Sequence, residues 1–458
     1  MSYWRNDDPV ARVNRLAAFD KAFNLDGWLA PWASFVDADR RDALGASQIA
    51  TLVENGVRCV RIMAAPSVLT ATVSENTAIY DAGGASWVPT ATNLTLLADT
   101  INLLHAAGIR TIIEWAHITG ENWTWSRVVQ GQEPRWKSMW LAIAAWVVDQ
   151  GFSSSMLAFE ISNEIGYIRT PAGGDWNNPG TFTSQAALSG PATWTLWKAV
   201  QEDLISAMRA YVPRHWIFAS DPFYQSMENC LLYDSVGDGL TAKAWHYYGP
   251  YEWSHQGYSF AENATFDGIS LLTRDNGTAL GYPVTAASSL AARNALASAG
   301  KTGLRDRIIA IYTAATGSTH GQDDMARHYQ QANIWRRLHN QEGIITEIGR
   351  SKHAEIEDWT KWISDNRVQQ ARYGISTCWF GLWDVDFDGD CDTRDFGFFW
   401  RDPSTDALTP DTNSLAAAGF IDAGYLEHSV DALVDVSAPS HPGFGSTSHQ
   451  IETGGAGL

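Results

Sequence analysis

The strongest constraint on the fold is a repeated alternation of short apolar segments with longer amphipathic segments. The longer segments carry apolar residues at helical spacing, whereas the short ones are apolar runs bounded by turn residues. The predicted strands are 22–29, 57–62, 110–115, 156–162, 215–219, 241–246, 343–346 and 374–379. The predicted helices are 48–55, 93–107, 136–150, 193–211, 322–340 and 355–370. This pattern indicates a buried parallel sheet covered by helices.

Eight such strands favour a closed (β/α)8 TIM barrel, of class α/β, over an open doubly wound sheet. None of the predicted strands is followed by a glycine-rich phosphate loop, which weighs against a dinucleotide-binding fold. We interpret segment 251–320, after the sixth strand, as a long insertion at one barrel end, with one helix at 286–299. We expect a single domain over 1–436 and a flexible tail rich in Gly, Ser and Pro over 437–458.

Composition limits the partners and the compartment. The net charge of −19 makes nucleic acids and anionic membrane surfaces unfavourable partners. The N-terminal MSYWRNDDPV has no apolar signal core, so we expect a cytoplasmic protein, or a secreted one if a signal peptide has been removed. The four cysteines are too few for a disulfide scaffold. Cys378 and Cys391 lie near one another in sequence, but nearness does not establish the geometry of a bridge.

Chemically versatile residues gather where the predicted strands end, which is where a barrel displays its functional groups. They are Arg61, Glu114, Trp115, His117, Asn163, Glu164, His246, Tyr247, Tyr248, Glu347, Trp379, Trp383 and Asp384. Glu164 and Glu347 follow two different apolar strands, and two carboxyl groups about 5–5.5 Å apart suit retaining glycoside hydrolysis. Alternatively, both glutamates are surface residues in ion pairs. The His, Tyr and Trp residues at neighbouring strand ends favour the catalytic interpretation.

Other strand-end residues fit the same chemistry. Asn163 is an uncharged donor suited to a sugar 2-hydroxyl. Arg61 would keep one carboxylate ionised, since a nearby positive charge lowers a carboxyl pKa. The 22 tryptophans are mostly expected in the core, but those at strand ends could stack on sugar rings.

Five motifs in chain order resemble glycoside hydrolase family 5, within the clan of retaining (β/α)8 hydrolases. They are NLDGWL in the first strand, GVRCVRI in the second, LAFEISNE in the fourth, WHYYGP in the sixth and ITEIG in the seventh. The similarity extends from about Ala22 to Trp400. It implies that Glu164 is the acid/base and Glu347 the nucleophile. By the same resemblance, Arg61, Asn163, His246 and Tyr248 support them.

The sequence departs from the family pattern in two places. The family's third strand ends in Asp-x-His, whereas here Glu114 is followed by Trp115, Ala116 and then His117. We expect His117 to contact substrate. At the eighth strand either Trp379 or Trp383 would lie under the bound sugar, and the adjacent Asp384 favours Trp383.

The stretch after the eighth strand predicts a calcium loop. Acids occupy positions 1, 3, 5, 7, 9 and 12 of a twelve-residue pattern, with Gly389 at position 6. They are Asp384, Asp386, Asp388, Asp390, Asp392 and Asp395. Carboxylate oxygens without a histidine cluster favour calcium. The alternative is a solvated acidic loop, and Asp384 would not easily bind both calcium and sugar.

These observations predict a retaining glycoside hydrolase that cleaves β-linked glycans by double displacement, most consistent with an endo-β-1,4-glucanase. Alternatives are an exo-acting β-glycosidase or a β-mannanase of the same fold, or a non-catalytic carbohydrate-binding barrel. The expected partner is an oligo- or polysaccharide, and catalysis is expected to need no cofactor. Calcium would only be structural.

Overall fold

The computed structural model describes residues 14–29, 44–64, 91–115, 133–164, 191–221, 225–257, 267–313, 322–351, 353–384, 397–401 and 407–421. Eight parallel strands form a closed barrel in which each strand pairs with its neighbours in chain order and β8 pairs with β1. They are β1 Ala22–Leu29, β2 Cys59–Ala64, β3 Arg110–Trp115, β4 Leu157–Glu160, β5 Trp216–Ser220, β6 Thr241–Tyr247, β7 Glu342–Ile348 and β8 Ser376–Trp379. The predicted barrel is therefore confirmed.

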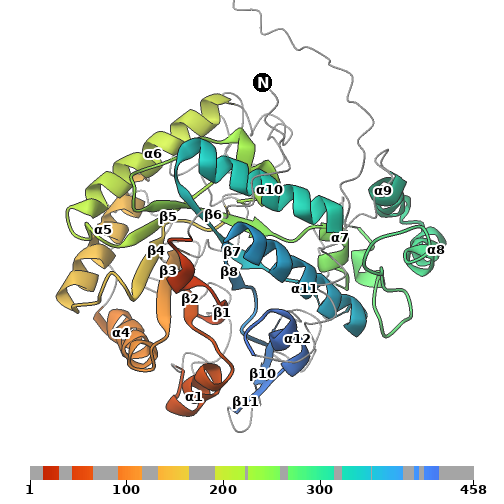
Figure 1. The fold of residues 1–458 in the computed structure, drawn as a ribbon, viewed down its shortest axis with the longest axis horizontal. Helices are drawn as coiled ribbons and strands as arrows, with labels where there is room; N and C mark the ends of the chain where they lie inside the picture. Colours follow the sequence, from red (N-terminus) through yellow and green to blue (C-terminus); the bar gives the residue numbers. More distant parts are fainter. Residues whose placement is uncertain are drawn as a thin grey trace, which may run out of the picture. The chain divides into compact units, whose positions relative to one another are not determined.

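Helices surround these strands (Figure 1). They are α1 Ala46–Glu54, α4 Ala91–Ala106, α5 Glu133–Asp149, α6 Pro191–Arg209, α10 Gln322–His339 and α11 Ile356–Tyr373. Each corresponds to a predicted helix, with ends shifted by a few residues. The end of α11 shows the local cause: Gly374 has φ 60, and its N–H bonds the carbonyl of Gln370. A residue without a Cβ adopts this left-handed conformation at low cost and stops the helix.

Short elements complete the described chain. They are η1 Ala17–Phe19, η7 Met227–Leu232, α7 Tyr251–Ser254, η9 Ile269–Leu271, α8 Leu290–Ser298, α9 Thr302–Thr313, β9 Trp383–Asp384, β10 Phe399–Arg401, β11 Leu408–Pro410 and α12 Thr412–Ala417. The predicted helix 286–299 corresponds to α8, whereas α9 was not predicted. In α9, Leu304 and Ile308 are buried, and the partly buried Ile311 and Tyr312 pack against the same core at helical spacing.

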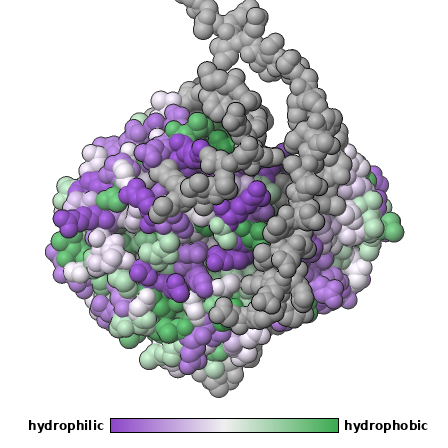
Figure 2. Space-filling model, in the orientation of Figure 1, coloured by the Kyte–Doolittle hydropathy of each residue, from purple (hydrophilic) through white to green (hydrophobic). Residues whose placement is uncertain are grey.

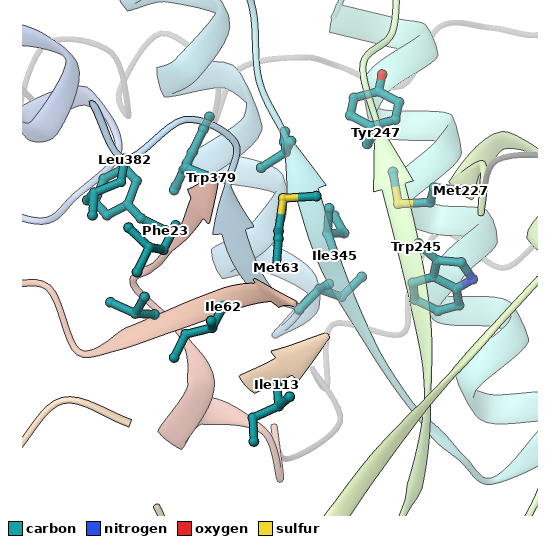
Figure 3. Close-up of a cluster of buried hydrophobic side chains, with 14 of the residues drawn as sticks. Phe23, Ile62, Met63, Ile113, Met227, Trp245, Tyr247, Ile345, Trp379 and Leu382 are labelled. Atoms are coloured by element: carbon teal, nitrogen blue, oxygen red, sulfur yellow. The ribbon is translucent and has the colours of Figure 1, made fainter. Parts of the chain in front are cut away.

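Alternate residues of the strands form two separate apolar cores, because successive strand side chains point to opposite faces. One core lies between barrel and helices, where Trp245 packs on Trp335 of α10 and Phe159 packs on Trp140 of α5. Figure 3 shows part of it. The other core forms the floor of the barrel interior. Its strand residues are Ala22, Cys59, Ile112, Ala158, Trp216, Phe218, Ala242, Ala244, Ile344 and Cys378.

Cys378 belongs to that floor and is buried and free, whereas Cys391 lies outside the described residues. On the molecular face in Figure 2, hydrophilic and hydrophobic residues are interspersed. Among the described residues, no helix combines the length and apolar character needed to cross a membrane.

Candidate active site

A buried polar layer lies above the apolar floor, toward the C-terminal ends of the strands. On seven strands, the residue two positions beyond a floor residue is polar. These residues are Asn24, Arg61, Glu114, Glu160, Ser220, His246 and Thr346, and each is at most 3% exposed. The period of two places them on the same inner face as the floor. Buried polar groups need partners, so this layer forms a hydrogen-bonded network.

Arg61 is the centre of that network. Its Nε donates to Glu160 Oε2 at 2.6 Å, and its Nη1 donates to Glu347 Oε1 at 2.9 Å and also to Asn24 Oδ1. Its Nη2 donates to Asn163 Oδ1 at 2.7 Å. Arginine has five donors in a rigid planar fork, which lets one side chain orient four partners. Residues from β1, β2, β4, β7 and the segment after β4 thereby converge.

Glu347 reaches this network through an irregularity in β7. The register of β7 shifts against β6 between Trp245 and His246, and against β8 between Ile345 and Ile348. As a result, two consecutive residues make buried inner contacts: Thr346 Oγ1 donates to Glu160 Oε1 at 2.9 Å, and Glu347 accepts from Arg61. Strict alternation would direct Glu347 to the outer face. A bulge of this kind re-aims a side chain.

The Glu347 carboxyl is buried and well supplied with donors. Tyr248 donates its hydroxyl to Oε2 at 2.9 Å, while Arg61 donates to Oε1. Burial raises the pKa of Glu347, and the charge of Arg61 and the Tyr248 hydrogen bond oppose that rise. Burial and the neighbouring Glu347 raise the pKa of Tyr248, so its hydroxyl remains a neutral donor.

Glu164 lies just beyond β4 and is less buried, with 26% of its side chain exposed. Its Oε1 is 2.8 Å from Nδ1 of His246, and the same nitrogen is 3.4 Å from Glu347 Oε2. Burial lowers the pKa of His246 to about 4, so the imidazole is neutral near neutral pH. A neutral ring nitrogen can donate to a carboxylate in one tautomer and accept from a carboxylic acid in the other. His246 therefore suits a Glu164 that changes protonation state.

The two glutamates face one another across a short gap. One carboxylate oxygen of Glu164, one of Glu347 and one ring nitrogen of His246 all lie within 4.8 Å of one another. Among the described residues, this is also the group whose donor atoms are close enough to hold a metal ion. Two carboxyl groups at this spacing, one buried and one partly exposed, suit bond cleavage by an acid and a nucleophile.

Glu114 is the unusual member of the polar layer. It is fully buried, and neither of its carboxyl oxygens has a hydrogen-bond partner in the described part of the chain. The nearest arginine atom, Nη2 of Arg61, is 3.9 Å away. Burial raises the pKa of Glu114 well above its usual value despite Arg61, and Glu160 and Glu347 raise it further. Glu114 is therefore the member of the layer that retains its proton as the pH rises.

This assignment predicts a pH-dependent effect of Glu114→Gln on stability. A carboxyl whose pKa is raised on folding destabilises the folded state increasingly as the pH rises above the unfolded pKa, by about 1.4 kcal/mol per unit of pKa difference. Glutamine removes this cost. We expect the Tm of the variant to gain progressively on the wild type, by a few degrees in all, as the pH rises above the unfolded carboxyl pKa of about 4.3; calorimetry measures the difference. A Tm difference that does not change with pH would contradict the assignment.

The structure brings together six residues singled out from the sequence: Arg61, Asn163, Glu164, His246, Tyr248 and Glu347. Trp379 is only 1% exposed and packs against Trp362 and Phe398. Trp383 and Asp384 form β9, but their side chains lie outside the described residues. The remaining predicted site residues also lie outside them: His117, Asp386, Asp388, Asp390, Asp392 and Asp395.

Sequence reasoning missed four network residues. Asn24, Glu160 and Thr346 carried a usable signal, because each is a polar residue two positions beyond an apolar inward residue of a strand. Gln225 carried none. It lies in the segment after β5, and its contacts become visible only once the chain is folded.

The family model of the cellulases, glycosyl hydrolase family 5, matches residues 21–386. Among curated proteins, none is significantly similar in sequence to this chain. Similar solved structures include Cel5A of Thermotoga maritima in complex with cellobiose, at 17% identity and TM-score 0.58, covering 90% of this chain and 100% of that one. A lichenase from Caldicellulosiruptor sp. F32, in a complex with cellotetraose, has 12% identity and TM-score 0.58, covering 87% and 91%.

Cel5A of Thermotoga maritima has also been solved with mannotriose, and that structure matches at 16% identity and TM-score 0.58, over 90% of this chain and 100% of that one. At these identities the structural similarities show the shared barrel. The family model covers most of the chain and names the enzyme class. The chain belongs to the cellulase family, glycosyl hydrolase family 5, and is a glycoside hydrolase of the β-glycan-cleaving type.

Proposed function

We propose that this protein is a retaining β-glycanase, with an internally cleaved β-1,4-glucan as its first substrate. The observation that carries the proposal is the spacing of the two glutamates, whose facing oxygens lie within 4.8 Å. Retaining enzymes hold their carboxyl groups about 5–5.5 Å apart, whereas inverting enzymes leave about 6.5–9.5 Å for a water molecule. A pair of oxygens this close supports the shorter, retaining separation over the longer, inverting one.

In the first step, an oxygen of Glu347 attacks the anomeric carbon as the glycosidic bond breaks. Glu164 gives its proton to the departing oxygen, and a covalent glycosyl ester with Glu347 remains. Arg61 and Tyr248 each donate to one oxygen of Glu347, which orients the carboxylate and opposes the effect of its burial. Glu164 is the better proton donor because its side chain is the more exposed and can reach a leaving group at the barrel mouth.

In the second step, Glu164 takes a proton from water as that water attacks the anomeric carbon. The bond to Glu347 breaks and the carboxylate is regenerated, so the two inversions give net retention. Glu164 thus changes from acid to base within one cycle. Nδ1 of the neutral His246 beside it can donate to the carboxylate form of Glu164.

The choice of a β-1,4-glucan is supported by what similar structures hold. Cel5A of Thermotoga maritima was solved with cellobiose and with mannotriose, and the lichenase complex holds cellotetraose. A mannan is therefore the second candidate. The structural calcium loop formed by the aspartates from Asp384 to Asp395 remains a prediction, and it would take no part in bond cleavage.

The test is hydrolysis of defined soluble β-1,4-glucan, mixed-linkage β-glucan and β-mannan, with product sizing and proton NMR of the first anomer formed. We expect cleavage of the β-1,4-glucan into a range of oligosaccharides, with the β-anomer appearing first. An α-anomer formed first would exclude retention. Release of only the terminal unit would indicate exo action, and turnover of mannan alone would move the substrate to the second candidate.

A further inference from the structure

Gln225 connects Glu160 of the buried polar layer with the main chain of Glu164, although it is neither charged nor on a barrel strand. It is fully buried in the segment that follows β5. Its Nε2 donates to Glu160 Oε1 at 3.0 Å, and its Oε1 accepts from the main-chain N–H of Glu164 at 2.6 Å. Its own carbonyl accepts from the N–H of His246 at 2.8 Å. One residue therefore contacts the chain at Glu164, the strand that carries His246, and the carboxylate that orients Arg61.

The main chain at Glu164 needs such a restraint. Glu164 has φ 39, a left-handed conformation that is strained for a residue with a Cβ. A strained conformation persists only where its surroundings hold it. The Gln225 carboxamide bonds the N–H of this strained residue, and its other end is fixed by Glu160, which also accepts from Arg61 and Thr346.

We propose that Gln225 is a positioning residue that fixes the direction of the Glu164 carboxyl toward the leaving group. This inference rests on the proposed acid/base role of Glu164. Gln225 acts through the main chain of Glu164 and through Glu160, without touching the substrate. Its loss lets the strained segment relax, so Glu164 no longer delivers its proton along the required line. A displacement of about 1 Å from a productive geometry can cost about 100-fold in rate.

The test compares kcat/KM of Gln225→Met on two substrates that need the acid to different extents. The sugar leaving group of cellotetraose is poor and must be protonated as it departs. The dinitrophenolate of dinitrophenyl β-cellobioside departs readily without a proton. Both values report the first bond cleavage. We expect the variant to lose about 30-fold to 100-fold on cellotetraose and less than about 3-fold on the dinitrophenyl substrate. Equal losses on both substrates, or none, would overturn the proposal.

Gln201→Met is the matched control. Gln201 is also a fully buried glutamine whose Oε1 accepts a main-chain N–H, that of Ser220 at 2.9 Å, but it lies on α6. The same substitution therefore removes a comparable hydrogen bond. We expect a lowered Tm and an unchanged ratio of the two kcat/KM values. A changed ratio in this control would mean that general destabilisation produces the selectivity, and would overturn the proposal.

Gln225→Glu keeps the test decisive if Gln225→Met does not fold. The introduced carboxyl retains an acceptor for the N–H of Glu164 but sets a second acid against Glu160. We expect a selective loss on cellotetraose of about 3-fold to 10-fold, intermediate between wild type and Gln225→Met. An unchanged ratio would overturn the proposal. If the proposed function is wrong, the result is different: the wild-type protein would then cleave neither cellotetraose nor dinitrophenyl β-cellobioside.

Discussion

Replacing Glu347 by glutamine is expected to lower kcat/KM on a soluble β-1,4-glucan by at least about 10⁴-fold, the scale at which loss of a covalent nucleophile usually acts. An amide is a poor nucleophile, yet it has nearly the same shape. Its carbonyl oxygen can still accept from Arg61, and its NH2 can donate to the Tyr248 hydroxyl oxygen in place of the hydrogen bond that Tyr248 donates to Glu347. The loss should therefore appear in kcat without a large fall in Tm. Steady-state kinetics and circular dichroism measure the two quantities.

The control for Glu347→Gln is Glu342→Gln on the same strand. Glu342 is buried at the opposite end of β7 and pairs with Arg336 at 2.7 Å. Losing this charge should lower the Tm, because half of a buried ion pair would remain unpaired. We expect kcat/KM to stay within about 3-fold of wild type, since Glu342 lies far from where a barrel performs chemistry. If Glu347→Gln retained more than about 1% of the wild-type activity, Glu347 would not be the nucleophile.

Replacing Glu164 by alanine is expected to produce a loss that depends on the leaving group. General acid catalysis contributes about 10²–10⁴-fold, and a substrate that leaves without protonation does not need it. We expect kcat/KM to fall by about 10³-fold or more on cellotetraose and by less than about 10-fold on dinitrophenyl β-cellobioside. The second step still needs a base, so kcat on the activated substrate should also fall as the glycosyl-enzyme accumulates.

Azide distinguishes the two glutamates in this design. In Glu164→Ala, azide should attack the glycosyl-enzyme from the vacated acid/base side, restore kcat and give a β-glycosyl azide. In Glu347→Ala, azide should occupy the space of the nucleophile, displace the aryl group directly and give an α-glycosyl azide. NMR of the products decides between the assignments. The opposite pattern would exchange the two roles, and an α-azide from both variants would contradict double displacement.

The barrel could be predicted because its signal is local. The stop after α11 at Gly374 and the apolar run of β4 can each be recognised within a few neighbouring residues. Repeating such units eight times leaves few ways to bury every strand, and closure is the solution observed. The helix α9 carries a local signal too, because Leu304, Ile308 and Ile311 stand at helical spacing, but segment 251–320 was assigned only the helix 286–299.

The residue types of the site could also be predicted, because the C-terminal ends of parallel strands meet at one barrel end. Knowing only that β4 and β7 are strands of one barrel places Glu164 and Glu347 at a common mouth. Strand side chains alternate between the two faces, so counting two positions on from the inward residues Ala158 and Ile344 would have added Glu160 and Thr346 to the predicted site. It would also have directed Glu347 outward, because the bulge in β7 has no signature in ITEIG.

The sequence by itself determined the order of strands and helices and the chemical groups at the strand ends, because both depend on residues a few positions apart. Only the tertiary structure decided which oxygen faces which donor. The inward turn of Glu347 depends on pairing with β6 and β8, and the restraint on Glu164 depends on Gln225, 61 residues later. Burial, likewise, sets the protonation of Glu114 and His246. Such contacts and desolvation arise from segments distant in sequence, so no local pattern encodes them.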